Sequence, residues 1–368
     1  MILQSIDILN FKNIGGTTLE FSPGVNCLLG MNGMGKSNLL DAIHFLSIGR
    51  AMNGLPDSAL MKHGENTMLV KGVFKNDSGG EDTVSCGVTE GKSKRLRCNG
   101  KDCRKMSEHI GRFPVVSVTP NDSRLVSGSA EERRKLMDMV ISQANPLYLA
   151  SLMRYSRSLE SRNRMLRAGV RDKLLYESVE NTMAEAAAVV HDIRKNWVAE
   201  IAPQIEGVYE RLSGRRETVG LAYNSRLNEK SFTELLEERR QKDTVLGYTS
   251  AGIHRDDIEV SLDGMSMRNL GSQGQLKTFV IALRLAVFGF LKKARNITPL
   301  LLLDDIFDKL DASRVENIMK EVTSNNDFSQ IFITDTNRKH LDDIVSVIDG
   351  DNALINVENG NFTFINGI

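Results

Sequence analysis

Three glycines, a lysine and a serine near the N-terminus have residue types and a spacing that could hold a phosphate group. They lie between Gly30 and Ser37, in the sequence G-M-N-G-M-G-K-S, which fits the pattern G-x-x-x-x-G-K-[ST]. Glycines let successive backbone N–H groups face a phosphate, and the positive end of the following helix favours the same anion. In this pattern Lys36 reaches the β- and γ-phosphates, and the hydroxyl of Ser37 lies on Mg²⁺. The segment therefore predicts a site for a nucleoside triphosphate.

The segments on either side distinguish this prediction from a chance match in a turn. Before the loop, the apolar residues Val25, Cys27, Leu28 and Leu29 are typical of a buried strand. After the loop, Leu39, Leu40, Ile43 and Leu46 lie on one stripe at helical spacing. A strand, a glycine-rich loop and a helix in this order are the context that the pattern requires.

A second group is an apolar run that ends in two carboxylates, Leu300 to Asp305. Such a run is typical of a buried strand, whose C-terminal end would deliver a carboxylate beside the phosphate loop. Asp304 is predicted to contact Mg²⁺, directly or through water, and Asp305 to orient or deprotonate the attacking water. The alternative is a pair of loop or helix-capping carboxylates.

The third group, S-Q-G-Q at 272–275, opens an apolar helix. Ser272 and the backbone of Gly274 would present donors at a helix N-terminus, which suits a γ-phosphate. Taken alone, the same residues favour an ordinary helix start with a serine cap.

Length and composition limit the class of protein. At 368 residues the chain is too long for one compact core of ordinary size, and two lobes are expected. The 47 basic and 47 acidic residues leave no net charge, so any site for a polyanion must be a local patch. The four cysteines form no C-x-x-C pair and are expected to be reduced thiols rather than metal ligands.

The sequence shows no evident targeting or membrane segment. The N-terminus alternates like a strand, and the longest apolar stretch, Phe279 to Leu291, is interrupted by Arg284. A cytoplasmic location is therefore expected.

The pattern of elements changes twice along the chain. The first part, to about residue 115, is strand-rich apart from the helix after the phosphate loop. Long helices follow, the clearest with an apolar stripe from Leu175 to Trp197 and with Pro203 near its end. Strands return from about Tyr248, and a hairpin at Asn359-Gly360 closes the chain.

Together these motifs resemble the ATPase head of the ABC type, in which the S-x-G-Q signature acts across a dimer interface. Their order, with D-K-L-D at 308–311 after the acidic strand, is similar to that of SMC-related heads in particular. From end to end the chain resembles the bacterial RecF recombination-mediator family. The residues that carry this resemblance are Phe11 to Asn13, Gly30 to Asn38, Pro120 to Asp122, Glu132 to Arg134, Arg162-Asn163, Gly252 to Asp257, Gly271 to Gln275 and Leu301 to Asp305.

The resemblance implies an α/β fold, a P-loop ABC/SMC-type ATPase head with an inserted, mainly helical lobe. The head is expected at 1–115 plus 248–368 and the helical lobe at 116–247. The implied cofactors are ATP and Mg²⁺. The implied function is that of a DNA replication and repair protein, a slow DNA-dependent ATPase that forms a homodimer on ATP binding. Such a clamp binds single-stranded/double-stranded DNA junctions at gaps and helps to load recombinase with RecR-type and RecO-type mediator proteins.

The predicted site residues follow from the same motifs. Lys36 and Asp305 are the expected catalytic residues, and Ser37 and Asp304 the expected Mg²⁺ contacts. The S-Q-G-Q residues are expected to act in the partner's site of a dimer. The expected nucleotide-binding residues are Asn13, Gly30, Met31, Asn32, Gly33, Met34, Gly35, Lys36, Ser37, Asn38, Asp122, Ser272, Gly274 and Gln275.

Four positions depart from the patterns of these families. Asp305 stands where many ABC-type heads have Glu, and its shorter side chain is consistent with slow turnover. The segment 334–336 (T-D-T) has no switch histidine. The segment 120–122 (P-N-D) has no Q-loop glutamine, which leaves Asp122 as the candidate sensor of the γ-phosphate or Mg²⁺. Ser37 replaces the Thr that is common in the RecF family, a change that the chemistry tolerates.

Basic residues outnumber acidic ones between 154 and 173, which is the expected DNA-binding part of the helical lobe. The basic residues are Arg154, Arg157, Arg162, Arg164, Arg167, Arg171 and Lys173. Arg157, Arg164 and Arg171 recur every seven residues and are expected on one side of a helix, with Arg154 nearby. Such a face would bind DNA phosphates in a salt-sensitive, sequence-indifferent way. The alternative is a solvated helix face with ion pairs within the helix.

Three other classes of protein share the phosphate loop. An SMC-type chromosome-structural protein needs a long heptad-rich arm, and the insert at 116–247 is short and contains Pro203. A transporter-type ATPase subunit would be expected to carry the Gln and His switch residues. A metabolic kinase has no role for the S-Q-G-Q element or for a second lobe.

Overall fold

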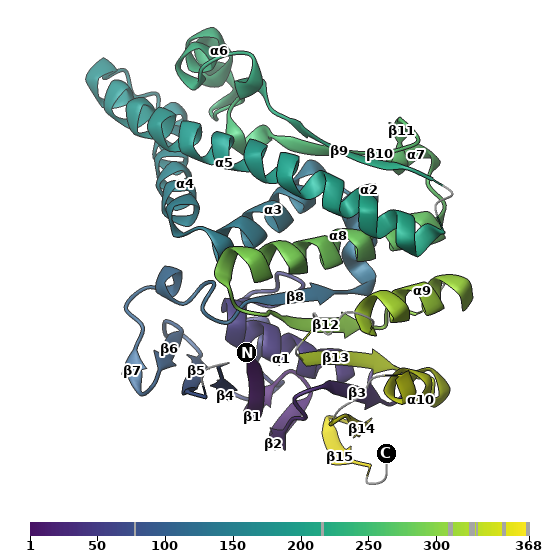
Figure 1. Ribbon diagram of the computed structural model, residues 1–368. Helices are drawn as coiled ribbons and strands as arrows, with labels where there is room; N and C mark the ends of the chain where they lie inside the picture. Colours follow the sequence, from purple (N-terminus) through teal and green to yellow (C-terminus); the bar gives the residue numbers. More distant parts are fainter. Residues whose placement is uncertain are drawn as a thin grey trace. The chain divides into compact units, whose positions relative to one another are not determined.

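The chain folds into two compact units, which Figure 1 shows in a computed structural model. The structure describes residues 1–76, 79–214, 217–307, 312–323, 328, 330–347 and 351–365. Unit 1 consists of Met1–Asp122, Arg211–Gly214 and Val280–Ile368, and unit 2 of Ser123–Glu210 and Arg215–Phe279.

One sheet of unit 1 is antiparallel and has six strands in the order β2-β1-β4-β5-β6-β7. Buried and exposed positions alternate along β4, as expected for a sheet with one face on the core. The strands are β1 (Ile2–Phe11), β2 (Ile14–Glu20), β4 (Thr67–Lys75), β5 (Glu81–Thr89), β6 (Arg95–Cys98) and β7 (Lys101–Asp102).

The second sheet of unit 1 has the order β15-β14-β3-β13-β12-β8, and all its neighbouring strands are parallel except the β14–β15 hairpin. The central strands β3, β12 and β13 are almost continuously buried, which explains their apolar sequences. Because they are parallel, their carboxyl ends meet at one edge, where Asp304 pairs with Thr334. The strands are β3 (Val25–Leu29), β8 (Val115–Val118), β12 (Leu300–Asp304), β13 (Gln330–Asp335), β14 (Ala353–Glu358) and β15 (Asn361–Phe364).

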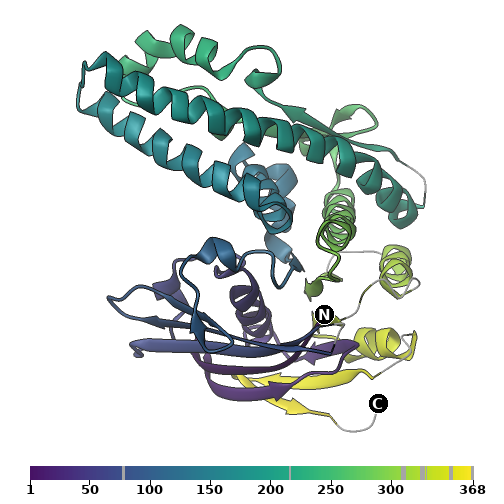
Figure 2. The same cartoon turned by 60° about the vertical axis from the view of Figure 1, so that its left-hand side comes forward.

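Helix α1 (Lys36–Ile48) packs against both sheets, so that one hydrophobic core joins them. Leu39, Ile43 and Leu46 of the predicted stripe are fully buried in this core. Helices α9 (Ala312–Thr323) and α10 (Arg338–Val347) follow β12 and β13 in the chain (Figures 1 and 2). The phosphate-loop helix is thus held on two sides by the core of unit 1.

Unit 2 combines helices with a three-stranded antiparallel sheet of order β11-β10-β9. Its helix α4 runs antiparallel to the long helix α5 (Figure 2), and Arg154 and Arg162 of α4 pair with Glu185 and Glu180 of α5. The helices are α2 (Arg124–Ser127), α3 (Ala130–Ala144), α4 (Pro146–Arg167), α5 (Lys173–Ser213), α6 (Phe232–Leu246), α7 (Met267–Leu270) and α8 (Gln273–Arg295), of which α5 and α8 continue into unit 1. The strands are β9 (Val219–Asn224), β10 (Asp257–Leu262) and β11 (Met265–Ser266).

The compact units have different limits from the predicted lobes. Unit 2 includes residues up to Phe279, whereas the predicted helical lobe ends at 247. The reason is strand pairing, because β10 pairs with β9 along its whole length and therefore belongs to the unit that contains β9. As a division into functional domains, the predicted limits remain a prediction.

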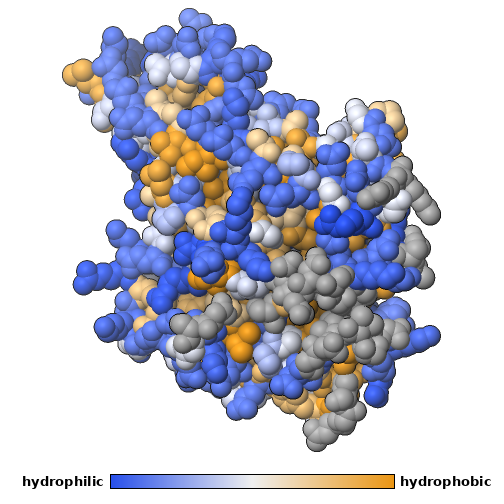
Figure 3. Space-filling model, viewed as in Figure 1, coloured by the Kyte–Doolittle hydropathy of each residue, from blue (hydrophilic) through white to orange (hydrophobic). Residues whose placement is uncertain are grey.

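Two helices differ in detail from what the sequence suggested. Helix α5 continues past Pro203 to Ser213, although Pro203 was expected near its end. Helix α8 is long and apolar enough to cross a membrane by length and composition, although no such segment was expected. Of the most apolar window of α8, 72% is buried inside the protein, as in a core helix. The face of the molecule drawn in Figure 3 is mostly hydrophilic.

Candidate nucleotide site

The phosphate loop connects β3 to α1 and depends on two glycines with positive φ. Gly33 has φ +83° and Gly35 has φ +114°, a conformation that other residues rarely adopt. A Cβ at Gly35 would also lie 2.9 Å from the side-chain amide of Asn13. A Cβ at Gly33 would meet nothing within 4 Å, so conformation alone requires glycine there. The loop of Met31, Asn32 and Gly33 is exposed to solvent.

Lys36 lies at the first position of α1 and is folded back along the loop. Its Nζ donates to the carbonyl of Gly30 at 2.6 Å and to that of Met31 at 3.1 Å. Burial lowers the pKa of Lys36, and the nearby carboxylates of Asp305 and Asp304 act in the opposite direction. A half-desolvated ammonium beside the exposed loop is suited to bind an anion.

Ser37 and the acidic strand meet directly. The Ser37 hydroxyl donates to Oδ1 of Asp304 at 2.8 Å, and the Thr334 hydroxyl donates to the same oxygen at 2.8 Å. Burial raises the pKa of Asp304, and these two hydrogen bonds oppose that rise. A hydroxyl and a carboxylate side by side form the oxygen donor set that Mg²⁺ prefers, so these residues fit that ion.

Asp305 follows where the chain leaves β12, with φ +48°. Its N–H donates to Oγ1 of Thr334 at 2.9 Å, so Thr334 holds both carboxylate residues at the strand end. Sequence reasoning missed Thr334. Thr334 on β13 is the register partner of Asp304 on β12. The parallel pairing of these two strands therefore places Thr334 beside Asp304.

The loop is braced by Asn13 and by Asn38. The Asn13 side chain donates to the carbonyl of Met34 at 3.2 Å and accepts from the Asn38 side chain at 2.8 Å. Both residues were predicted from the family resemblance, and the structure brings them together beside the loop.

The C-terminal hairpin also contacts the loop at both ends. The N–H of Gly360 donates to the carbonyl of Met34 at 2.8 Å. A Cβ at Gly30 would lie 2.4 Å from the carbonyl oxygen of Val357, so β14 approaches the loop closely. The sequence predicted the hairpin but not this contact, because nothing in the local pattern links it to a loop more than three hundred residues earlier.

Asp122 is not hydrogen-bonded to the described residues of the loop. Its carboxylate accepts from the N–H and hydroxyl of Thr119 at 3.1 Å each and pairs with Arg284 at 2.9 Å. Asp122 and Arg284 are both largely buried. The sensor role of Asp122 therefore remains a prediction, and in this conformation its carboxylate is occupied by Arg284.

The segment 334–336 contains no switch histidine, but a histidine from the following helix lies close to the same strand end. Nδ1 of His340, on α10, is 3.0 Å from Oδ2 of the buried Asp335, the last residue of β13. Sequence reasoning missed His340 because it lies a helical turn beyond the expected position. The D-K-L-D segment at 308–311 lies outside the described residues.

Within unit 2, the S-Q-G-Q element is an exposed capping box. Ser272 N–H donates to the side chain of Gln275 at 2.6 Å, and Gln275 N–H donates to the Ser272 hydroxyl at 3.3 Å. The amide of Gln275 also donates to Glu217 at 2.7 Å, and Gly274 accepts from Thr278. The serine-cap alternative thus describes the local structure, and the action of Ser272 in a partner's site remains a prediction.

The predicted basic face of unit 2 is smaller than expected. Helix α4 ends at Arg167, where Gly169 adopts φ +64°, so Arg171 lies beyond the helix and does not continue the stripe of Arg157 and Arg164. Arg162 is 1% exposed and binds Glu180 and Asp243, which removes it from any DNA-binding face. Arg157 and Arg164 are exposed, whereas Arg154 pairs with Glu185 at 2.7 Å.

The cysteines are all free thiols. Sγ of Cys103 lies 3.2 Å from Sγ of Cys98, and burial raises the pKa of Cys98 to about 12. Among the described residues, no group of three or more His, Cys, Asp or Glu side chains is arranged to hold a metal ion.

The fold and the site define a class of protein. The chain has a phosphate loop between β3 and α1, an acidic strand beside the loop, and a mixed sheet whose strands are mostly parallel. These features define an ABC/SMC-type ATPase head, as predicted. The family model described as the RecF/RecN/SMC N terminal domain matches residues 2–355. The chain belongs to this family and, within it, to the RecF family of DNA replication and repair proteins.

Relatives and solved structures support this assignment over the full chain. The DNA replication and repair protein RecF of Porphyromonas gingivalis is 44% identical over 98% of this chain and 99% of its own. That of Parabacteroides distasonis is 45% identical over 98% of each chain. A structure of the recombination mediator protein RecF-ATP in the RecFOR pathway has a TM-score of 0.88 at 28% identity and covers 99% of this chain and 97% of that one. An Smc head domain from Pyrococcus furiosus, 18% identical, covers 99% of this chain and 95% of that one with a TM-score of 0.58 and shares the fold.

Proposed function

We propose that this chain is an ATP-controlled DNA clamp that acts in the cytoplasm at gapped DNA. The observation that carries the nucleotide part is the hydrogen bond of 2.8 Å between Ser37 and Asp304. It joins the phosphate loop to the acidic strand, and both residue types are those that a Mg²⁺-ATP site needs. The RecF-ATP structure, which this chain matches over 99% of its length, supports ATP as the nucleotide.

Each residue has a distinct role in this proposal. Lys36 would leave the carbonyls of Gly30 and Met31 and bind the β- and γ-phosphates. Ser37 and Asp304 would hold Mg²⁺, which when bound neutralises charge on the phosphate oxygens. Asp305 would orient the attacking water, and Thr334 would position both carboxylate residues.

The exposure of Ser272 in the S-Q-G-Q element supports dimerisation on ATP binding. Ser272 is exposed at the N-terminus of α8, where its hydroxyl and the first N–H groups of the helix can meet a γ-phosphate held by a second copy. Two chains would then enclose two ATP molecules, and slow hydrolysis would release the dimer. The affinity for DNA would depend on the nucleotide state, because only the dimer forms a closed clamp.

DNA and the mediator proteins are the proposed partners. The relatives are named DNA replication and repair proteins, and the matching structures are of RecF in the RecFOR pathway, which supports mediator proteins of the RecR and RecO type. Arg157 and Arg164 are the proposed DNA contacts in unit 2, since both are exposed and have no described carboxylate partner.

Light scattering with and without ATP and gapped DNA tests the proposal. We expect a monomer without ATP, a dimer with ATP and a more persistent dimer when gapped DNA is added. A chain that stays monomeric on gapped DNA whether or not ATP is present would overturn the clamp.

Two variants separate ATP binding from hydrolysis and from dimerisation. Lys36→Arg should retain ATP binding and lose hydrolysis, whereas Ser272→Arg should bind ATP and remain monomeric. Ser178→Arg, at an exposed serine on α5 of the same unit, is the matched control and should dimerise like the parent chain. An ATP-dependent dimer of Ser272→Arg in sedimentation would contradict the role of Ser272 in the partner's site.

A further inference from the structure

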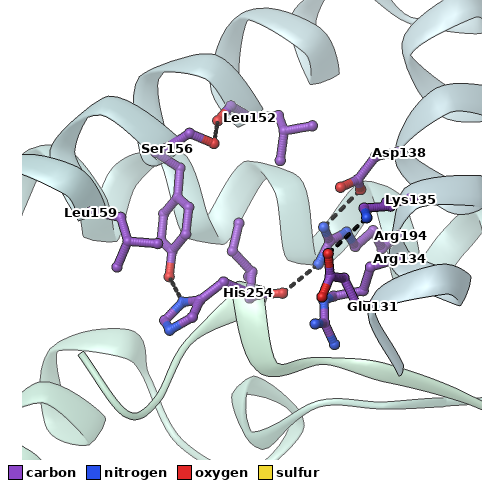
Figure 4. A pocket seen from close by; sticks show the side chains of 11 residues that line it. Glu131, Arg134, Lys135, Asp138, Leu152, Ser156, Leu159, Arg194 and His254 are labelled. Atoms are coloured by element: carbon purple, nitrogen blue, oxygen red, sulfur yellow. Dashed lines mark hydrogen bonds and ion pairs between the residues drawn. The ribbon is translucent and has the colours of Figure 1, made fainter. Parts of the chain in front are cut away.

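Unit 2 contains a pocket that is separate from the nucleotide-binding residues of unit 1. Its cavity volume is about 250 Å³, and its lining comes from α3, α4, α5 and the turn before β10. Figure 4 shows the lining side chains. Every one of them belongs to unit 2. The pocket is therefore a feature of that unit alone.

One wall of the pocket is apolar and is formed by α4. Leu152, Tyr155 and Leu159 are spaced at three and four residues, so they share one face of the helix. Figure 4 labels Leu152 and Leu159 on this wall. Tyr155 is 2% exposed, and its hydroxyl is hydrogen-bonded to Nδ1 of His254 at 2.6 Å. The ring is thereby fixed in place, and the wall can accept an apolar side chain.

The opposite wall is charged. Glu131, Arg134, Lys135 and Asp138 project from α3, and Arg194 projects from α5 (Figure 4). The pocket thus has an apolar side and a charged side facing a common space.

The rigidity of the pocket depends on residues that the nucleotide site does not use. Gly252 has φ +128°, and a Cβ there would lie 2.5 Å from the Tyr155 hydroxyl. Arg194 donates to the carbonyl of Ile253 at 2.7 Å and pairs with Asp256 at 2.9 Å. The segment 252–257 and Arg134, which the sequence singled out without a role, therefore meet at this pocket.

One cation of the pocket, Arg134, makes no direct ion pair with a described residue, although the carboxylates of Asp257, Asp138 and Asp256 act on it electrostatically. Arg194 pairs with Asp138 at 2.7 Å, and Lys135 pairs with Glu131 at 2.7 Å. Arg134 donates to the carbonyl of Asp256 at 2.6 Å, and it has no ion pair with a described residue. Its guanidinium has five N–H donors, so several stay available for an anion. A half-buried cation of this kind attracts a carboxylate or phosphate strongly.

We propose that this pocket binds a peptide segment of a partner protein, with an apolar side chain against Leu152 and Leu159 and a carboxylate on Arg134. The apolar wall favours a peptide over nucleic acid, because a phosphate backbone has nothing to place against leucine side chains. The volume suits a single anchoring side chain rather than a cofactor. Anchors of this type, buried in a pocket and flanked by one charged contact, dominate the free energy of protein recognition.

N-acetylphenylalanine is the probe, because it combines a ring with a carboxylate, and its amide is the neutral analogue. Binding is followed by the NMR shifts of methyl-labelled Leu152, Leu159 and Ile253 in the full chain. We expect the acid to shift these methyl groups in a saturable way and to bind about tenfold more tightly than the amide. Equal binding of acid and amide, or unchanged methyl shifts with both, would overturn the proposal.

Variants assign the recognition to named residues. Arg134→Gln should remove the preference for the acid, and Ser156→Phe should fill the pocket mouth and block both compounds. Lys242→Gln removes an exposed cation of α6 that does not line the pocket and should bind both compounds like the parent chain. Displacement of the probe by inorganic phosphate or by a short DNA duplex, abolished in Arg134→Gln, would show an anion or nucleic-acid site instead and contradict a peptide site.

Discussion

Ser37 and Asp304 are 267 positions apart in the sequence, and a hydrogen bond of 2.8 Å joins them. Ser37 is on the helix that follows β3, and Asp304 ends β12, with β13 between the two strands in the sheet. The candidate Mg²⁺ contacts therefore exist only when the first and last parts of unit 1 have assembled. Thr334, on the intervening strand, donates to the same Asp304 oxygen and holds it in place.

Replacing Asp304 tests this arrangement. Asp304→Asn should lower ATP hydrolysis about 100-fold or more, because Mg²⁺ contributes several kcal/mol to phosphoryl transfer and its carboxylate contact is lost. Hydrolysis and Mg²⁺-dependent ATP binding are the quantities to measure. Glu358→Gln removes an exposed carboxylate of β14 and should change neither. Wild-type hydrolysis by Asp304→Asn would show that another residue holds the ion.

Gly360→Ala tests the contact between the C-terminal hairpin and the phosphate loop. Gly360 has φ +78°, and a Cβ would lie 2.6 Å from the carbonyl oxygen of Asn13. We expect weaker ATP binding, since the hairpin must shift and its hydrogen bond to Met34 is lost. The measurements are the ATP dissociation constant and the free energy of unfolding.

Gly100→Ala is a close control for this prediction. Asn99-Gly100 and Asn359-Gly360 have nearly the same positive φ values, but a Cβ at Gly100 meets nothing within 4 Å. Both variants should lose about 1 kcal/mol of stability from the backbone conformation. Only Gly360→Ala should bind ATP less tightly, and equal ATP affinity in the two variants would rule out the bracing role.

The stability of unit 2 should depend on pH through His254. Burial lowers the pKa of His254 from 6.5 to about 4, a hydrogen bond to Thr249 opposes this shift, and Arg255 and Arg134 add to it. The unfolded chain therefore takes up a proton at a higher pH than the folded chain. Stability is fully present above about pH 6.5 and falls as the pH drops towards 4, by at most about 3 kcal/mol.

The comparison with His254→Asn isolates this effect from other acid-sensitive groups. Asn can still accept the hydrogen bond from Tyr155 but does not titrate. Chemical unfolding at several pH values should show a steeper loss of stability in the parent chain than in the variant. Parallel curves for the two proteins would mean that His254 does not carry the pH dependence.

Charge reversal on α4 tests the proposed DNA contacts. Arg157→Glu with Arg164→Glu should lower DNA affinity and flatten its dependence on salt, because fewer counterions are released when fewer phosphates are neutralised. The number of neutralised phosphates is measured by the slope of the logarithm of the binding constant against the logarithm of salt concentration. Lys242→Glu, at an exposed position on α6, is the control. An unchanged salt slope in the double variant would count against this face.

Much of the nucleotide site could be predicted from the sequence because its signals are local. Gly30 to Ser37 lie within one turn between a strand and a helix, and the apolar run before Asp304 indicates a buried strand on its own. The α/β head with an inserted lobe and the RecF family were predicted correctly from the family resemblance, which motifs along the whole chain carry. Backbone conformation and hydrophobic burial act over a few residues, so a single segment is enough to reveal them.

The tertiary structure decided what these segments contact. Three contacts join residues that are far apart in the chain. They are the hydrogen bond from Gly360 to Met34, the hydrogen bond from Thr334 to Asp304, and the ion pair of Asp122 with Arg284. The tertiary structure also excluded Arg162, one of the basic residues counted between 154 and 173, from DNA contact, because Glu180 and Asp243 bind it in the interior of unit 2. Local pattern determines which element a residue belongs to, but the partner of a charged side chain depends on which elements pack together. The sequence therefore determined the phosphate loop, and only the fold decided what holds it and which cations remain free to bind.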